Sequence, residues 1–83
     1  MEIEENFVII FKNDTTPAIW TRIETILKSY NSILVERVEY DIWNECYYYV
    51  DDGQLNDLFI TFNELVKNFN PQIKDFNIRI ECV

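Results

Sequence analysis

The sequence predicts an α+β fold in which two helices cover one face of a four-stranded antiparallel sheet. Two segments place apolar residues at helical spacing, which indicates amphipathic helices. Four other segments alternate with a period of two or are apolar throughout, which indicates strands. The order along the chain is strand, helix, strand, strand, helix, strand, and right-handed crossovers in that order place both helices on the same sheet face.

The composition indicates a single domain over residues 1–83. A chain of this length buries only about 60–65% of its unfolded surface, so its core must be dense. Hydrophobic residues make up 48% of the chain and aromatic residues 16%, whereas glycine occurs once and proline twice. This balance argues against a disordered chain and against a loop-rich scaffold.

The first strand and the first helix are expected at residues 3–11 and 17–30. Within the strand, residues 7–11 are apolar on both faces, which is typical of a central strand. The helix begins with a proline, which suits the first helical turn, and Thr15 or Thr16 can cap its free amides. Its apolar face carries Ile19, Ile23, Ile26, Leu27 and Tyr30.

A hairpin is expected next, with strands at residues 33–43 and 46–50 and a two-residue turn at Asn44 and Glu45. Alternation along the first of these strands predicts one face with Leu34, Val38, Tyr40 and Ile42, and another with Arg37, Glu39 and Asp41. Alternation along the second predicts that Tyr47 and Tyr49 point away from Cys46, Tyr48 and Val50.

The second helix is expected to start at residues 51–54, where Asp51 and Gln54 have the spacing of a capping box. Pro71 is expected to end it. The last strand is expected at residues 75–83, with Phe76, Ile78, Ile80 and Cys82 on one face. The apolar stripe of the helix consists of Leu55, Leu58, Phe59, Phe62, Leu65, Val66 and Phe69.

These elements together predict the ferredoxin-like fold with the spatial strand order 4-1-3-2. Two details agree with this order. The strand predicted to be central is the one that is apolar on both faces, and the strands predicted at the sheet edges are the ones that alternate.

The two cysteines are expected to be free and buried. Cys46 and Cys82 are too few for a disulfide framework, and the predicted first strand separates the strands that carry them. The chain shows no secretory signal and no apolar stretch that could span a membrane. We therefore expect a cytoplasmic protein.

The residue inventory argues against an enzyme. Histidine is absent, the cysteines have no CxxC partner, and Gly53 is the only glycine, so imidazole catalysis, a zinc site and a glycine-rich phosphate loop are all excluded. The aspartates at 51 and 52 are explained as helix caps. We expect no catalytic residue, no cofactor and no metal.

Aromatic residues on the uncovered sheet face indicate a binding protein. Trp43, Tyr47 and Tyr49 are expected there, in an arrangement that resembles the RNA-recognition motif in its geometry. The basic, glycine-bearing RNP1 pattern of that motif is missing. A formal net charge of −8 also repels phosphate, so direct nucleic-acid binding is not expected, and neither is membrane binding.

Acidic residues follow the second predicted strand and its turn. Such a row can attract a basic protein surface, although charges on an edge strand also serve to prevent aggregation. Because the row adjoins the exposed aromatics, we predict a partner-binding zone formed by Glu36, Glu39, Asp41, Trp43, Glu45, Tyr47 and Tyr49.

The function predicted from these features is that of a small acidic inhibitor or antidote, which blocks the basic surface of a nucleic-acid-binding protein or complex. Phage anti-defence proteins, including anti-CRISPR proteins, and toxin-immunity proteins share this profile of small size, acidity and absence of catalytic residues. Two alternatives stay open. One is a ligand-binding regulatory domain that forms a homodimer through its sheet, and the other is an accessory subunit of a larger assembly.

Overall fold

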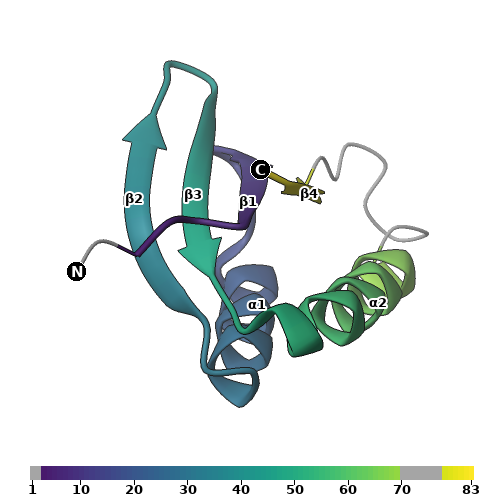
Figure 1. Ribbon diagram of the computed structural model, residues 1–83. Helices are drawn as coiled ribbons and strands as arrows, with labels where there is room; N and C mark the ends of the chain where they lie inside the picture. Colours follow the sequence, from purple (N-terminus) through teal and green to yellow (C-terminus); the bar gives the residue numbers. More distant parts are fainter. Residues whose placement is uncertain (1–2, 70–77) are drawn as a thin grey trace.

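Six elements follow one another in the predicted order in the computed structural model, which describes residues 3–69 and 78–83 (Figure 1). The helices and strands are β1 (Phe7–Lys12), α1 (Pro17–Ser29), β2 (Ile33–Glu39), β3 (Trp43–Tyr49), α2 (Asp52–Phe69) and β4 (Ile78–Cys82).

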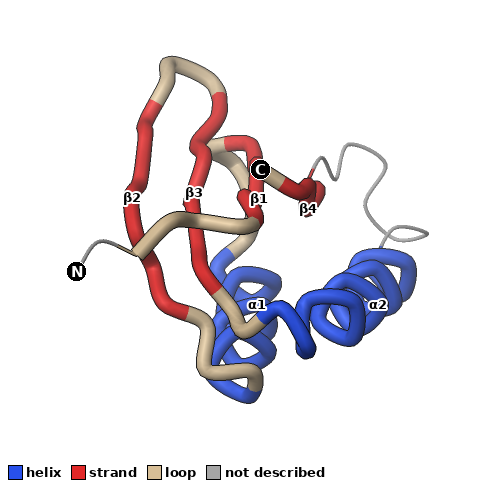
Figure 2. The backbone as a smooth tube through the Cα atoms, in the orientation of Figure 1, coloured by secondary structure: helices blue, strands red, loops and turns tan. Residues whose placement is uncertain are grey.

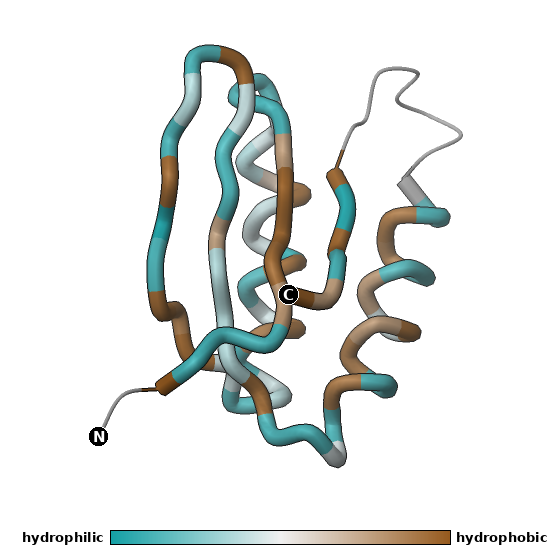
Figure 3. Tube along the Cα trace, turned by 45° about the horizontal axis from the view of Figure 1, so that its top comes forward, coloured by the Kyte–Doolittle hydropathy of each residue, from teal (hydrophilic) through white to brown (hydrophobic). Residues whose placement is uncertain are grey.

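The four strands form one antiparallel sheet in the order β2-β3-β1-β4 (Figure 2). This order confirms the ferredoxin-like fold. It also confirms that β1 is central and that β2 and β4 lie at the edges. Figure 3 shows the reason, because β1 is apolar along most of its length while β4 alternates.

Both helices pack on the same face of the sheet. The buried core joins alternate residues of the strands to the inner faces of the two helices. The hydroxyl of Tyr30, directly after α1, forms a 3.0 Å hydrogen bond with the hydroxyl of Thr61 in α2. Leu58, Phe62 and Leu65 are buried as expected. The side chain of Phe69, Pro71 and residues 75–77 lie outside the described residues. The core consists of Phe7, Ile9, Phe11, Ile19, Ile23, Leu27, Cys46, Tyr48, Val50, Leu58, Phe62, Leu65, Ile78 and Ile80.

The first strand begins at Phe7 and not at residue 3. The backbone amide of Asn6 still donates to the carbonyl of Tyr48 at 3.0 Å, and the Asn6 side chain makes the next bonds to the chain beyond β3. The side-chain amide of Asn6 donates to the carbonyl of Val50 at 2.6 Å, and its Oδ1 accepts from the Val50 amide at 3.1 Å. Residues 3–6 then cross in front of the end of β3 (Figures 1 and 3).

The predicted threonine cap of α1 is wrong. Thr16 occupies the N-cap position, but its side chain makes no capping hydrogen bond. The hydroxyl of Thr15 instead donates to the carbonyl of Lys12 at 2.7 Å, which closes the loop after β1. At the start of α2, the backbone amide of Gln54 donates to the carbonyl of Asp51 at 2.8 Å.

The hairpin turn also differs from the prediction. The amide of Tyr40 donates to the carbonyl of Trp43 at 2.9 Å, so Asp41 and Ile42 form the tip, and Trp43 begins β3 instead of ending β2. The polar pair predicted to turn lies within β3. Asn44 is buried there, and its side chain donates to Oδ1 of Asn13 in the loop after β1.

A register shift between Leu34 and Glu36 changes which residues of β2 share a face. Leu34 lies opposite Tyr48 on the helix-covered face, whereas Glu36 lies opposite Tyr47 on the other face. The predicted grouping of Leu34 with Val38 is therefore wrong, because Val35 is an extra residue that reverses the alternation.

The cysteines are both free, as predicted. Cys46 is buried in the core, and burial raises the pKa of its thiol. Cys82 is exposed, so the prediction that both are buried is wrong for this residue. It lies next to the chain end on an edge strand. In the described ranges, neither helix is long and apolar enough to cross a membrane.

Candidate functional site on the open face of the sheet

The face of the sheet opposite the helices carries aromatic, aliphatic and charged side chains in rows that run across the strands. We call it the open face. The pairing registers and the alternation of the strands assign its members. They are Val8, Ile10 and Lys12 of β1, Ile33, Glu36 and Val38 of β2, Trp43, Glu45, Tyr47 and Tyr49 of β3, and Arg79 and Glu81 of β4.

The centre of the open face is a carboxylate held between two aromatic side chains of the same strand. Trp43 Nε1 donates to Glu45 Oε2 at 3.1 Å, and the hydroxyl of Tyr47 donates to Glu45 Oε1 at 2.7 Å. The three residues are spaced by two, so the pleat of β3 points them the same way. Glu45 is thereby a negative charge with a fixed position on an aromatic surface.

The bond between Tyr47 and Glu45 changes the acidity of the phenol. The hydrogen bond to the carboxylate stabilises the protonated hydroxyl, and the negative charge of Glu45 disfavours formation of the phenolate. Together with partial burial, these effects raise the pKa of Tyr47 to about 12. Tyr47 therefore remains a hydrogen-bond donor to Glu45 at neutral pH.

The other end of Trp43 is fixed by the hairpin turn. Its ring stacks on Tyr40, with centroids 4.6 Å apart and planes inclined by 20°. The turn itself is attached to the loop after β1 by two hydrogen bonds from Asn13. The Asn13 side chain donates to the carbonyl of Asp41 at 2.8 Å, and the Asn13 backbone amide donates to the carbonyl of Ile42 at 3.1 Å. Trp43 is therefore oriented from both sides.

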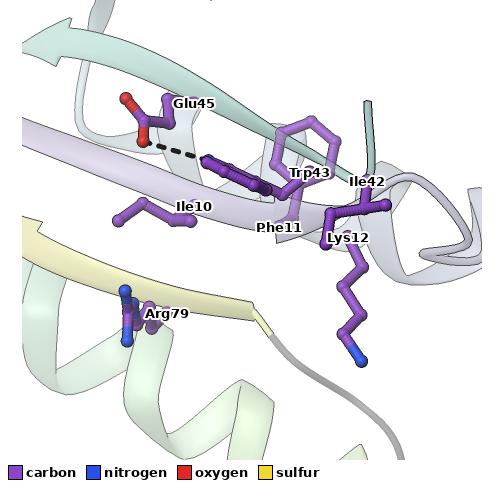
Figure 4. Close-up of a pocket in the computed structure, with 7 residues that line it drawn as sticks. All are labelled: Ile10, Phe11, Lys12, Ile42, Trp43, Glu45 and Arg79. Atoms are coloured by element: carbon purple, nitrogen blue, oxygen red, sulfur yellow. Dashed lines mark hydrogen bonds between the residues drawn. The ribbon is translucent and has the colours of Figure 1, made fainter. Parts of the chain in front are cut away.

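A hollow of about 270 Å³ lies on the open face next to Trp43 (Figure 4). Apolar side chains and charges of both signs surround it, contributed by β1, β3, β4 and the turn. Phe11 also borders it, although this residue belongs to the core. The residues lining it are Ile10, Phe11, Lys12, Ile42, Trp43, Glu45 and Arg79.

The structure brings together five of the seven residues predicted to bind a partner. Glu36, Trp43, Glu45, Tyr47 and Tyr49 all lie on the open face. The other two do not share it. Glu39 lies opposite Asn44 on the helix-covered side of β2, and Asp41 lies at the exposed tip of the turn.

The position of Glu39 follows from the register shift in β2. On the same side, Arg37 Nε lies 3.4 Å from Glu39 Oε1, and its guanidinium lies over the ring of Phe11 at 5.9 Å. Both side chains are largely exposed there, and Arg37 covers part of the Phe11 ring at the edge of the core. Glu39 serves that local arrangement instead of the open face.

Sequence reasoning missed the basic residues of the open face. Lys12 ends β1 directly opposite Trp43, and Arg79 lies opposite Ile10. The alternation of β4 would have placed Arg79 on this face. The alternation of β1 would also have placed Lys12 there, but the first strand is expected to end at residue 11, one position too early.

The β2 edge carries a second group of exposed apolar side chains, Ile33, Leu34 and Val35. The register shift at Val35 interrupts the regular ladder there, and charged residues follow. Irregularity and charge at an edge oppose the addition of a further strand. We therefore place the candidate site on the open face and not at this edge.

Within residues 3–69 and 78–83, no three histidine, cysteine, aspartate or glutamate side chains gather into a group that could hold a metal ion. The chain matches no protein-family model, and no curated protein matches it.

Proposed function

We propose that this protein is a small acidic inhibitor or antidote, of the anti-defence, anti-CRISPR or toxin-immunity kind, which covers the basic surface of a nucleic-acid-acting partner. The observation that carries the proposal is the Glu45 carboxylate held by Trp43 and Tyr47 on a sheet face that the helices leave uncovered. A fixed charge loses little side-chain entropy on binding, and tryptophan and tyrosine are the residues that dominate interface energy.

The overall charge supports the choice of a basic partner. A formal net charge of −8 accelerates the approach of a positively charged surface and repels nucleic acid. Glu36 extends the acidic character of the open face, because it lies directly across from Tyr47. A basic side chain of the partner can therefore contact a carboxylate and an aromatic ring of the open face at the same time.

Capture followed by competition tests the proposal. The immobilised protein is incubated with an extract of a cell that contains the natural partner, and the bound protein is then challenged with double-stranded DNA or with RNA. The proposal predicts that nucleic acid displaces the captured protein. It also predicts that Trp43→Ala weakens capture by about 2 kcal/mol or more, mainly through faster dissociation.

The matched control is Glu64→Lys on the exposed side of α2, which should capture the same protein as the wild type. A captured protein that nucleic acid does not displace would contradict inhibition at a nucleic-acid-binding surface. Capture that is equal in the wild type and the Trp43→Ala variant would contradict the assignment to the open face.

A further inference from the structure

The hollow beside Trp43 is lined by charges of both signs next to an apolar wall (Figure 4). Lys12 and Arg79 supply two cations, Glu45 supplies a carboxylate, and Ile10 and the Trp43 ring supply apolar surface. The registers explain this arrangement. Trp43 lies directly across from Lys12, whereas Glu45 and Arg79 lie on opposite sides of Ile10.

The charged groups keep unused hydrogen-bonding capacity. Nε of Arg79 lies 3.3 Å from Oε1 of Glu81. This ion pair does not use the two terminal nitrogens of the Arg79 guanidinium, which can donate to a ligand. In the part of the chain that the structure describes, Lys12 forms no ion pair. Each Glu45 oxygen accepts one bond, and an ionised carboxylate has about four acceptor sites.

The balance of charge decides the kind of ligand. The two cations are offset by Glu45 and by Glu81, which pairs with Arg79, so the hollow favours neither a simple anion nor a simple cation. A ligand that carries both charges can satisfy both sides at once. Neutral overall, it also avoids the repulsion that a formal net charge of −8 exerts on anions.

The strand register places the two kinds of charge on either side of Ile10. Glu45 and Arg79 lie two strand spacings apart, which is about 10 Å between their backbones. A ligand seated between them therefore has its ammonium group on the Glu45 side and its carboxylate on the Arg79 side. The apolar wall remains for a side chain.

We propose that this hollow binds a free α-amino acid with an aromatic or large aliphatic side chain. The ammonium group bonds to Glu45, the carboxylate to Lys12 and Arg79, and the side chain lies against Trp43 and Ile10. This binding is a separate activity from the capture of a protein partner, and it can be present or absent whichever partner is found.

Nuclear magnetic resonance of the uniformly ¹⁵N-labelled protein tests the inference. The Trp43 indole N–H, which donates to Glu45, is distinguished from that of Trp20 by the spectrum of Trp43→Phe. Four probes are titrated. L-phenylalanine carries both charges and a ring, phenethylamine lacks the carboxylate, 3-phenylpropionate lacks the ammonium, and glycine lacks the side chain.

The expected result is a saturable shift of the Trp43 signal with L-phenylalanine and binding at least about tenfold weaker for each of the other three probes, since each lacks one charge-assisted or apolar contact. Lys12→Gln should weaken the binding of L-phenylalanine at least several-fold, while Lys28→Gln in α1 should leave this binding unchanged. Glu45→Gln should reduce the advantage of L-phenylalanine over 3-phenylpropionate.

Three outcomes would overturn the inference. The first is the absence of a saturable shift of the Trp43 signal with L-phenylalanine up to about 20 mM, a concentration that would nearly saturate a site with a dissociation constant of about 1 mM. The second is equal binding of 3-phenylpropionate, which would make the hollow an anion site. The third is equal binding of phenethylamine, which would make it a cation site.

Discussion

The hydroxyl of Tyr47 donates a 2.7 Å hydrogen bond to the carboxylate of Glu45, two residues earlier on the same strand. The two-residue spacing on one strand allows this contact, and the structure shows that the hydrogen bond forms. It fixes the charge at the centre of the open face, and it makes the acidity of Tyr47 a direct report on that arrangement.

Titration of Tyr47 is the first prediction. Its pKa is raised from 10.0 to about 12, mainly by the hydrogen bond to Glu45. Glu45→Ala should bring the value back toward 10, as followed by NMR of tyrosine labelled with ¹³C at Cζ. The raised pKa means that this interaction stabilises the fold fully below about pH 10 and is lost as the pH rises toward 12.

The stability of the Glu45→Ala variant should therefore fall less between pH 10 and 12 than that of the wild type. Burial raises the pKa of Tyr48 as well, but this residue is common to both proteins, so the comparison isolates Tyr47. An unchanged Tyr47 titration in Glu45→Ala would show that the bond does not form in solution.

The packing of α2 is the second prediction. Phe62 is 1% exposed and Ile60, two residues earlier on the same helix, is 50% exposed. Phe62→Ala should lower the free energy of unfolding by about 3–5 kcal/mol, because it removes a buried ring and leaves a cavity. Ile60→Ala should cost less than about 1 kcal/mol. Equal losses in urea unfolding would mean that α2 does not pack on the sheet as described.

The attachment of the hairpin turn is the third prediction. Asn44 is buried, and its amide donates to Asn13. Asn44→Leu should cost about 1–3 kcal/mol because it leaves Asn13 without its partner, and it should also shift the NMR signal of the Trp43 indole. Asn63→Leu on the exposed side of α2 serves as the control. A neutral Asn44→Leu would show that the turn is held by other contacts.

The fourth prediction concerns the two thiols. Cys82 is exposed, whereas Cys46 is buried and its pKa is raised by burial. A disulfide reagent such as DTNB should modify one thiol rapidly and the other only on unfolding. Cys82→Ser should remove the rapid phase. Mass spectrometry that detects a native Cys46–Cys82 bond would contradict the separation of β3 and β4 by β1.

The central position of β1 and the two helical stripes could be predicted because each depends on local periodicity. An apolar strand must be covered on both faces, and the stripe through Leu58, Phe62 and Leu65 must face the sheet. The order of the elements then left few topologies, since crossover connections are right-handed. These arguments use residues that are neighbours in sequence.

The details of the hairpin could not be predicted in the same way. Asn44 resembles a turn residue, but a partner 31 positions earlier in sequence, Asn13, holds it inside the fold. The extra residue at Val35 reverses the faces of β2. Its one local sign is Glu36, which interrupts the apolar alternation between Leu34 and Val38 and which an edge strand tolerates in any case. Trp43, Tyr47 and Tyr49 lie on their predicted face, and Glu45, predicted in the turn, lies there with them. Glu39 does not lie on its predicted face, because it follows the shift.

Glu36 and Glu39 provide the most direct test of the proposed binding surface, because both are exposed on β2 and lie on opposite faces of the sheet. The measurement is the association rate of the captured partner with Glu36→Lys and with Glu39→Lys, over a series of salt concentrations. We predict that Glu36→Lys slows association by about tenfold at low salt and less at high salt, while Glu39→Lys has little effect. Equal effects of the two variants, or a larger effect of Glu39→Lys, would contradict binding through the open face.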